Sequence, residues 1–117
     1  MKLSEVRDTL KAMVLVGADQ MDKTVVGAGS ADLMEDVLAA AAKSAVLLTG
    51  VVTQQVVETA RIAAVGAVVF VRGKKPPEAV IELARAYNLP VLSTDYSLFV
   101  ASGRLYINGL RGLDGSW

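Results

Sequence analysis

The sequence contains no cysteine and no histidine. Without cysteine the chain cannot form a disulfide or offer a thiolate as a nucleophile or metal ligand. Without histidine it lacks the usual general base at neutral pH and a common ligand of zinc and iron. Disulfide scaffolds, thiol or histidine catalysis and the usual zinc and iron sites are therefore excluded. We expect no catalytic residue, no metal and no cofactor.

An excess of charge of either sign is also missing, because twelve Lys and Arg residues balance twelve Asp and Glu residues. A neutral domain gives no electrostatic reason to expect DNA, RNA or an anionic membrane as a partner. No stretch approaches the ~20 apolar residues that span a bilayer, and residues 1–5 lack the apolar core of a signal peptide. We expect a soluble cytoplasmic domain without nucleic-acid or membrane partners.

Hydrophobic residues, in contrast, make up 53% of the 117 residues. A chain of this length forms one domain, and so small a domain buries only about two-thirds of the surface of its unfolded chain. Some of the Val, Leu and Ala side chains are therefore expected in a contact between subunits. We predict a homodimer, and a separate protein partner is a further expectation.

The apolar stretch Ala67–Val71 is the segment on which the predicted fold is centred. Its residues are all apolar and mostly β-branched or aromatic, and it lies between Gly66 and the polar run 72–77. A short apolar run between turn signals is typical of a strand that is buried on both faces. We predict an inner strand of a small, mostly parallel sheet.

Periodic patterns predict the other elements. Helices are expected over residues 3–13, 32–43, 54–65, 76–87 and 96–102. Strands are expected over residues 14–16, 24–26, 45–49 and 90–93, with a short edge segment at 105–107. From residue 45 onward strands and helices alternate, which favours right-handed parallel crossovers. The predicted fold class is α/β: a single compact domain with a mostly parallel central sheet flanked by helices.

Local signals predict where several helices begin. Asp32 and Thr53 are good N-cap residues for the helices that follow them, and Thr94–Asp95 is predicted to cap the last helix. Pro76 and Pro77 suit a first helical turn, where the missing N–H group costs nothing.

Three further segments carry weaker signals. The runs 14–16 and 24–26 are expected to pair as a hairpin-like ribbon. The segment 27–30, Gly-Ala-Gly-Ser, is predicted to be a tight turn rather than a phosphate-binding loop, because Asp32 replaces the third glycine of the dinucleotide fingerprint. The tail 109–117 contains three glycines and no periodicity, so we expect it to be loose or docked on a partner chain.

A group of carboxylates, Asp32, Glu35 and Asp36, lies near the start of one predicted helix. Such a group can bind a divalent cation or act in acid–base chemistry. Acidic residues in a first helical turn are also favoured by the helix dipole. We prefer this second interpretation and predict no metal site.

The carboxyl ends of the predicted parallel strands are the best candidate for a ligand site, because the connecting loops converge there. The residues expected at this edge are Thr49, Gly50, Arg72, Gly73, Lys74, Lys75, Ser93, Thr94 and Asp95. Lys74 and Lys75 precede a helix N-terminus, which favours anions. The predicted ligand is a nucleotide or another phosphorylated small molecule. The alternative is that the threonines and Asp95 serve as caps and that the lysines are solvated.

Several segments resemble the DRTGG-domain family. They are Asp22–Gly27 with Ala31–Leu38, Val69–Lys74, Leu89–Thr94 and Phe99–Tyr106. The resemblance extends over about residues 2–110. Lys23, Val26 and Ala28 depart from the family pattern, which favours Arg, Thr and Gly at these positions.

The resemblance implies an α/β fold similar to the N-terminal domain of HPr kinase, pairing into dimers and a regulatory role, and it brings no catalytic residues. Residues 1–110 are accordingly expected to form a DRTGG-like domain, followed by a tail over residues 111–117. We expect a non-catalytic regulatory or interaction module rather than an enzyme. The alternative is a small-ligand sensor that binds an adenine nucleotide or another phosphorylated metabolite at the strand-end loops.

Overall fold

The computed structural model describes residues 1–39 and 42–113, which form a five-stranded sheet of order β1-β5-β4-β3-β2. The strands are β1 (Met13–Val16), β2 (Ala28–Ser30), β3 (Val46–Thr49), β4 (Ala67–Phe70) and β5 (Val91–Ser93). Strands β2 to β5 pair in parallel, and β1 pairs antiparallel to β5 at one edge. The predicted α/β class and mostly parallel sheet are confirmed.

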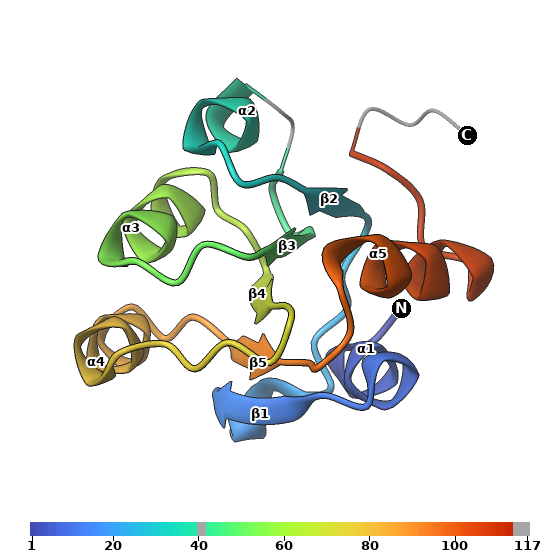
Figure 1. Cartoon of the computed structure of the whole chain (residues 1–117), viewed down its shortest axis with the longest axis horizontal. Helices are drawn as coiled ribbons and strands as arrows, with labels where there is room; N and C mark the ends of the chain where they lie inside the picture. The colour runs from blue at the N-terminus through green and yellow to red at the C-terminus, as the bar shows by residue number, and fades with distance from the viewer. Residues whose placement is uncertain (40–41, 114–117) are drawn as a thin grey trace.

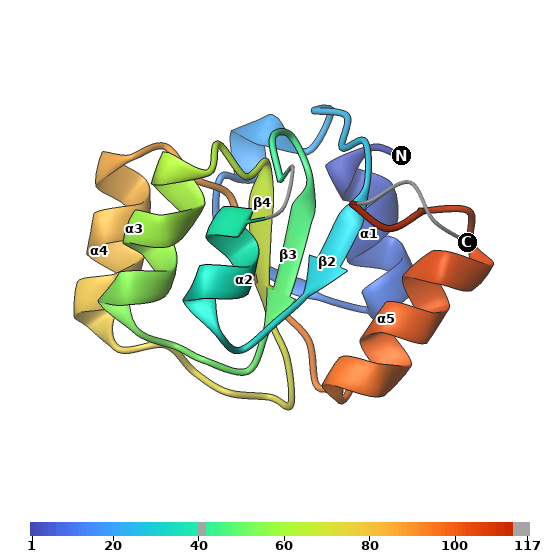
Figure 2. The ribbon, with the colours of Figure 1, turned by 90° about the horizontal axis from the view of Figure 1, so that it is seen from above.

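Helices cover both faces of this sheet. They are α1 (Leu3–Leu10), α2 (Met34–Ala39), α3 (Gln54–Ile62), α4 (Glu78–Ala86) and α5 (Leu98–Ile107), with a short 3-10 turn at Ala18–Gln20. Helices α2, α3 and α4 lie on one face and α1 and α5 on the other (Figure 1; Figure 2). In the described ranges no helix has the length and apolar character needed to cross a membrane.

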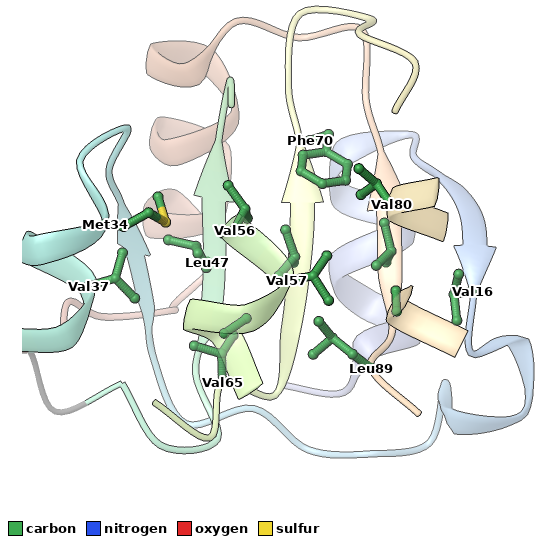
Figure 3. Close-up of a cluster of buried hydrophobic side chains, with 14 of the residues drawn as sticks. Val16, Met34, Val37, Leu47, Val56, Val57, Val65, Phe70, Val80 and Leu89 are labelled. Atoms are coloured by element: carbon green, nitrogen blue, oxygen red, sulfur yellow. The ribbon is translucent and has the colours of Figure 1, made fainter. Parts of the chain in front are cut away.

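The central strand β4 is buried on both faces, as its sequence predicts. Val68 and Phe70 belong to the cluster formed with α2, α3 and α4, whereas Ala67 and Val69 belong to the cluster formed with α1 and α5. Figure 3 shows the first cluster, with Phe70 pointing toward Val80 of α4. Because helices cover both faces of the sheet, the side chains of residues 67–71 are buried on both sides, which explains why all of them are apolar.

The predicted pairing of the first two strands is wrong. Residues 24–26 form no strand beyond a single bridge from Thr24 to Lys2, and β1 instead pairs with β5. The predicted turn at 27–30 is wrong as well, because Ala28–Ser30 forms β2, in parallel register with Val46–Leu48. The glycines give this segment little intrinsic preference for a strand. It becomes an edge strand because its backbone pairs with the neighbouring strand β3.

The end of the chain also differs from the prediction. Helix α5 continues through Gly103 to Ile107, so the predicted edge segment at 105–107 is helical. Burial of Leu105 against the sheet outweighs the helix-weakening effect of a single glycine, which is about 1 kcal/mol. The cap is Ser97, whose Oγ accepts a hydrogen bond from the Val100 N–H at 3.1 Å, and not the predicted Thr94–Asp95.

Helix α2 is shorter than the predicted helix 32–43, since it runs from Met34 to Ala39. Residues 40–41 of that prediction lie outside the described residues. Thr53 stands at the N-cap position of α3, as predicted, but its side chain makes no capping hydrogen bond.

The first part of the predicted tail packs on its own chain. Leu110 is buried, the Ala28 N–H donates to the Arg111 carbonyl at 2.9 Å, and Gly112 bridges to Ala28 in parallel. A Cβ atom at Gly29 would lie 2.7 Å from Leu113, so the glycine lets this segment close over β2. Residues 114–117 lie outside the described residues, and the domain boundary at residue 110 stays a prediction.

A hydrogen bond between α3 and the end of α4 gives a pH-dependent prediction. Tyr87 Oη donates to Glu58 Oε1 at 2.7 Å, and this bond raises the pKa of Tyr87 above 10.0. Because the folded-state pKa exceeds the unfolded value, the contact stabilises the fold below about pH 10 and is lost as the pH rises through the folded pKa. We expect Glu58→Gln to lower the pKa of Tyr87, measured by tyrosinate absorbance with Tyr87→Phe to assign the transition. An unchanged titration of Tyr87 in Glu58→Gln would contradict the hydrogen bond as the cause.

Candidate functional site

The connections that leave the sheet diverge at one point, between β4 and β5. The chain passes from β4 to α4 on one face, and from β5 to α5 on the opposite face (Figure 1). Strands β2 to β5 follow one another in order across the sheet, so the connections after β2, β3 and β4 all lead to the same face. In open α/β sheets, ligands bind at the carboxyl ends of strands where neighbouring connections diverge. The sheet topology thus selects the ends of β4 and β5.

A cavity of about 340 Å³ lies at this point, between β1, β5, α4 and the loop after β4. This volume lies near the lower end of the range that small-molecule sites occupy, roughly 300–1,000 Å³. Its lining residues are Lys11, Met13, Leu15, Gly73, Lys75, Pro76, Ile81, Ser93 and Asp95. Apolar side chains from β1, α4 and the loop form much of the wall, and polar groups lie among them.

The charged groups around the cavity are Lys11, Lys75 and Asp95, and all three are exposed. Within residues 1–39 and 42–113, none of these three side chains makes an ion pair or a hydrogen bond. Unpaired lysines are available for an anionic group, and an unpaired carboxylate is available for hydroxyl or amino donors. The cavity therefore offers a mixed surface, with an apolar part and both signs of charge.

A second polar group lies further along the same edge, at the ends of β2, β3 and β4. Asp32 Oδ1 accepts hydrogen bonds from the Gly50 N–H at 2.9 Å and from the Thr49 hydroxyl at 3.2 Å. Arg72 Nη2 lies 4.0 Å from Asp32 Oδ2, and both side chains are about half exposed, so this ion pair is weak. The predicted role of Asp32 as the cap of α2 is replaced by this contact with the β3 end.

The side chains of Lys74 and Arg72 both contact Gly50, which belongs to the same cluster of polar contacts. Lys74 Nζ donates to the Gly50 carbonyl at 2.8 Å, and the Arg72 guanidinium lies so close to Gly50 that a Cβ atom there would collide with it. The backbone N–H groups of Arg72 and Gly73 donate to the carbonyls of Tyr96 and Thr94, at 2.8 and 2.9 Å. These donors hold the loops together and are not directed at the cavity.

The sequence-predicted site residues therefore separate into three sets. Gly73, Lys75, Ser93 and Asp95 line the cavity. Thr49, Gly50, Arg72 and Lys74 form the internal polar group with Asp32. Thr94 is buried, and its hydroxyl donates to the Leu10 carbonyl at 2.7 Å, so it joins α1 to the sheet.

Sequence reasoning missed part of the cavity. Lys11, Met13 and Leu15 come from α1 and β1, whose position beside β5 no local pattern predicts. Pro76 and Ile81 lie in the region predicted to be a helix. The apolar face of that helix, α4, is the sequence pattern that could have placed Ile81 in the cavity wall. In the described part of the chain, no three acidic residues gather closely enough to hold a metal ion.

Comparison with known proteins gives two positive findings. The family model of the DRTGG domain matches residues 5–106. A solved structure, the CBS and DRTGG domains of the regulatory region of Clostridium perfringens pyrophosphatase in complex with its activator diadenosine tetraphosphate, superimposes with a TM-score of 0.74. That protein is 20% identical in sequence, and the match covers 89% of this chain and 45% of that chain. A search of curated proteins found no match.

Proposed function

The chain belongs to the DRTGG-domain family, and from this membership we propose that it is a non-catalytic regulatory module that binds a small phosphorylated ligand. The proposed site is the cavity at the ends of β4 and β5, and the preferred ligand is an adenine nucleotide. We place this role in the cytoplasm. The observation that carries the proposal is that two lysines, Lys11 and Lys75, lie beside an apolar wall and have no partner among the described residues.

The chemistry of the cavity matches the parts of a nucleotide. A planar base packs well on apolar side chains, here Met13, Leu15 and Ile81. The ammonium groups of Lys11 and Lys75 suit a phosphate, and the Asp95 carboxylate can accept hydrogen bonds from ribose hydroxyls. The nucleotide complex of the pyrophosphatase regulatory region, which contains a domain of the same family, supports this choice of ligand.

A non-catalytic role is supported by the residues around the cavity. The sequence supplies no histidine or cysteine, and the hydroxyl of Ser93 has no described hydrogen bond to a base. A serine nucleophile needs an adjacent base to be activated. Binding of a ligand is therefore a better match to this site than turnover of a substrate.

A thermal-shift screen tests the proposal. A ligand that binds only the folded state raises the stability by RT ln(1 + [L]/Kd), which is about 2.7 kcal/mol at a hundredfold excess over Kd. We expect AMP, ADP or ATP to raise the melting temperature by several degrees, and adenosine or inorganic phosphate alone to raise it less. A flat response to all three nucleotides and to a panel of phosphorylated metabolites would overturn the proposal.

The substitution Lys75→Ala locates the site. Loss of one charge-assisted hydrogen bond removes about 1.5–3 kcal/mol, so we expect the affinity for the nucleotide to fall about tenfold or more in isothermal titration calorimetry. Lys43→Ala is the matched control. Lys43 is an exposed lysine just before β3, at the amino ends of the parallel strands and so away from the cavity at their carboxyl ends. Equal affinity of the Lys75→Ala and Lys43→Ala variants would place the ligand elsewhere.

A further inference from the structure

Helix α5 presents an apolar stripe to the outside of the molecule. Phe99 is 87% exposed and Ile107 is 84% exposed, and Val100 and Tyr106 are each more than 40% exposed. At about 100° per residue, these side chains and Gly103 lie on the face of α5 opposite to buried Ala101 and Leu105. Figure 2 shows α5 at the outer edge of its layer. Four large apolar side chains exposed on one face of a helix are a candidate interaction surface.

Gly103 lies at the centre of this stripe, and the fold does not explain its presence. A Cβ atom at Gly103 would meet nothing within 4 Å. Alanine would fit there and would favour the helix by about 1 kcal/mol. A glycine on an exposed helix face does, however, allow the backbone of another helix to approach closely. The residue thus indicates a contact with something outside the described chain.

The stripe is symmetric about Gly103. Phe99 and Ile107 lie at equal distances along the sequence on either side of it, and so do Val100 and Tyr106. In an antiparallel pair of α5 helices related by a two-fold axis at Gly103, Phe99 of one copy lies level with Ile107 of the other. Val100 then lies level with Tyr106. Each exposed apolar side chain of the stripe therefore meets apolar side chains of the other copy, as an isologous contact requires.

The charges beside the stripe do not oppose this pairing. The five stripe residues carry no charge. Arg104 lies over the Tyr96 ring of its own chain at 4.4 Å, and Arg111 lies over the Tyr106 ring at 4.6 Å. Arg111 thus covers one face of the Tyr106 ring, while among the described residues no cation lies over the other stripe side chains. The stripe side chains themselves therefore fit an uncharged apolar helix face, such as the α5 face of a second copy.

We infer that α5 is the contact between two copies of this chain, which pair antiparallel through the stripe with Gly103 at the two-fold axis. The surface is separate from the ligand cavity and does not depend on the proposed function. Because each copy contributes one helix, the contact is small compared with the roughly 1,600 Å² of a standard stable interface. The dimer should therefore dissociate on dilution. This contact is the proposed interface of the homodimer that the sequence predicts.

Single cysteines test this arrangement directly, because the natural sequence contains none. A disulfide needs Cα atoms about 4.4–6.8 Å apart. We expect Gly103→Cys to form a covalent dimer on mild oxidation, because the axis brings position 103 of both copies together. Ile62→Cys is the matched control, since Ile62 is an exposed apolar residue on α3. Cross-linking of both variants to the same extent, or of neither, would overturn the proposal.

Sedimentation velocity gives an independent test that needs no cross-link. We expect the mass to rise with concentration from 12.3 kDa toward twice that value. Phe99→Ser should weaken association at least tenfold, and Ile62→Ser should leave it unchanged. Both positions are exposed, so both variants should fold normally, with circular dichroism as the check. A monomer at every concentration, or a dimer that Phe99→Ser does not weaken, would exclude α5 as the contact.

Discussion

Replacing both cavity lysines by glutamate, Lys11→Glu with Lys75→Glu, should abolish binding of a phosphorylated ligand. Each lost charge-assisted hydrogen bond removes about 1.5–3 kcal/mol, so the loss of two corresponds to at least about a hundredfold in Kd. The new carboxylates also repel a phosphate and join Asp95 at the same cavity. Isothermal titration calorimetry with the nucleotide that gives the largest thermal shift measures the effect.

The same double variant should unfold at nearly the wild-type temperature. Both lysines are exposed and unpaired within the described residues, and surface substitutions of this kind usually change stability by less than about 0.5 kcal/mol. Lys43→Glu serves as a charge-reversal control at the amino ends of the parallel strands, away from the cavity. A double variant that retains wild-type affinity would show that the ligand does not contact this cavity, even if the protein does bind nucleotides.

Truncation of Phe70 to alanine should cost about 3–5 kcal/mol of stability. Phe70 is fully buried on the central strand β4 and contacts the helical layer of α3 and α4 (Figure 3). Small domains have a total stability of about 5–15 kcal/mol, so this loss is a large fraction of it. Urea denaturation followed by circular dichroism gives the free energy of unfolding.

The other phenylalanine provides a matched control. Phe99 is 87% exposed on α5, so Phe99→Ala should change the free energy of unfolding by less than about 0.5 kcal/mol at a concentration where the protein is monomeric. The two variants remove the same side chain from opposite environments. Similar free energies of unfolding for both would contradict the placement of Phe70 in the core.

The part of the fold between residues 45 and 93 could be predicted because its signals are local. Each buried strand there is a short apolar run, and each is followed by a helix with a clear apolar face. The two outer strands could not be predicted in the same way. β1 pairs with β5, which is remote in sequence, and β2 is a Gly-containing edge strand with little intrinsic preference for its conformation.

The location of the candidate site follows from the order of strands and helices, but its composition does not. Lys74 and Lys75 are equivalent in the sequence, and only the contact of Lys74 with the Gly50 carbonyl distinguishes them. The apolar wall depends on Met13 and Leu15, and hence on the pairing of β1. Whether the four predicted residues along the cavity bind a ligand stays a prediction.

The pairing of β1 with β5 has a consequence for the order in which the protein assembles. Met13 is in register with Ser93, so the first strand must wait during synthesis until β5 has left the ribosome. The crossover units from β3 to β5 connect neighbours in sequence and need no such delay. Because β1 supplies one wall of the cavity, a nascent chain can possess most of its sheet before it possesses the cavity. Ligand recognition would then report that folding is complete.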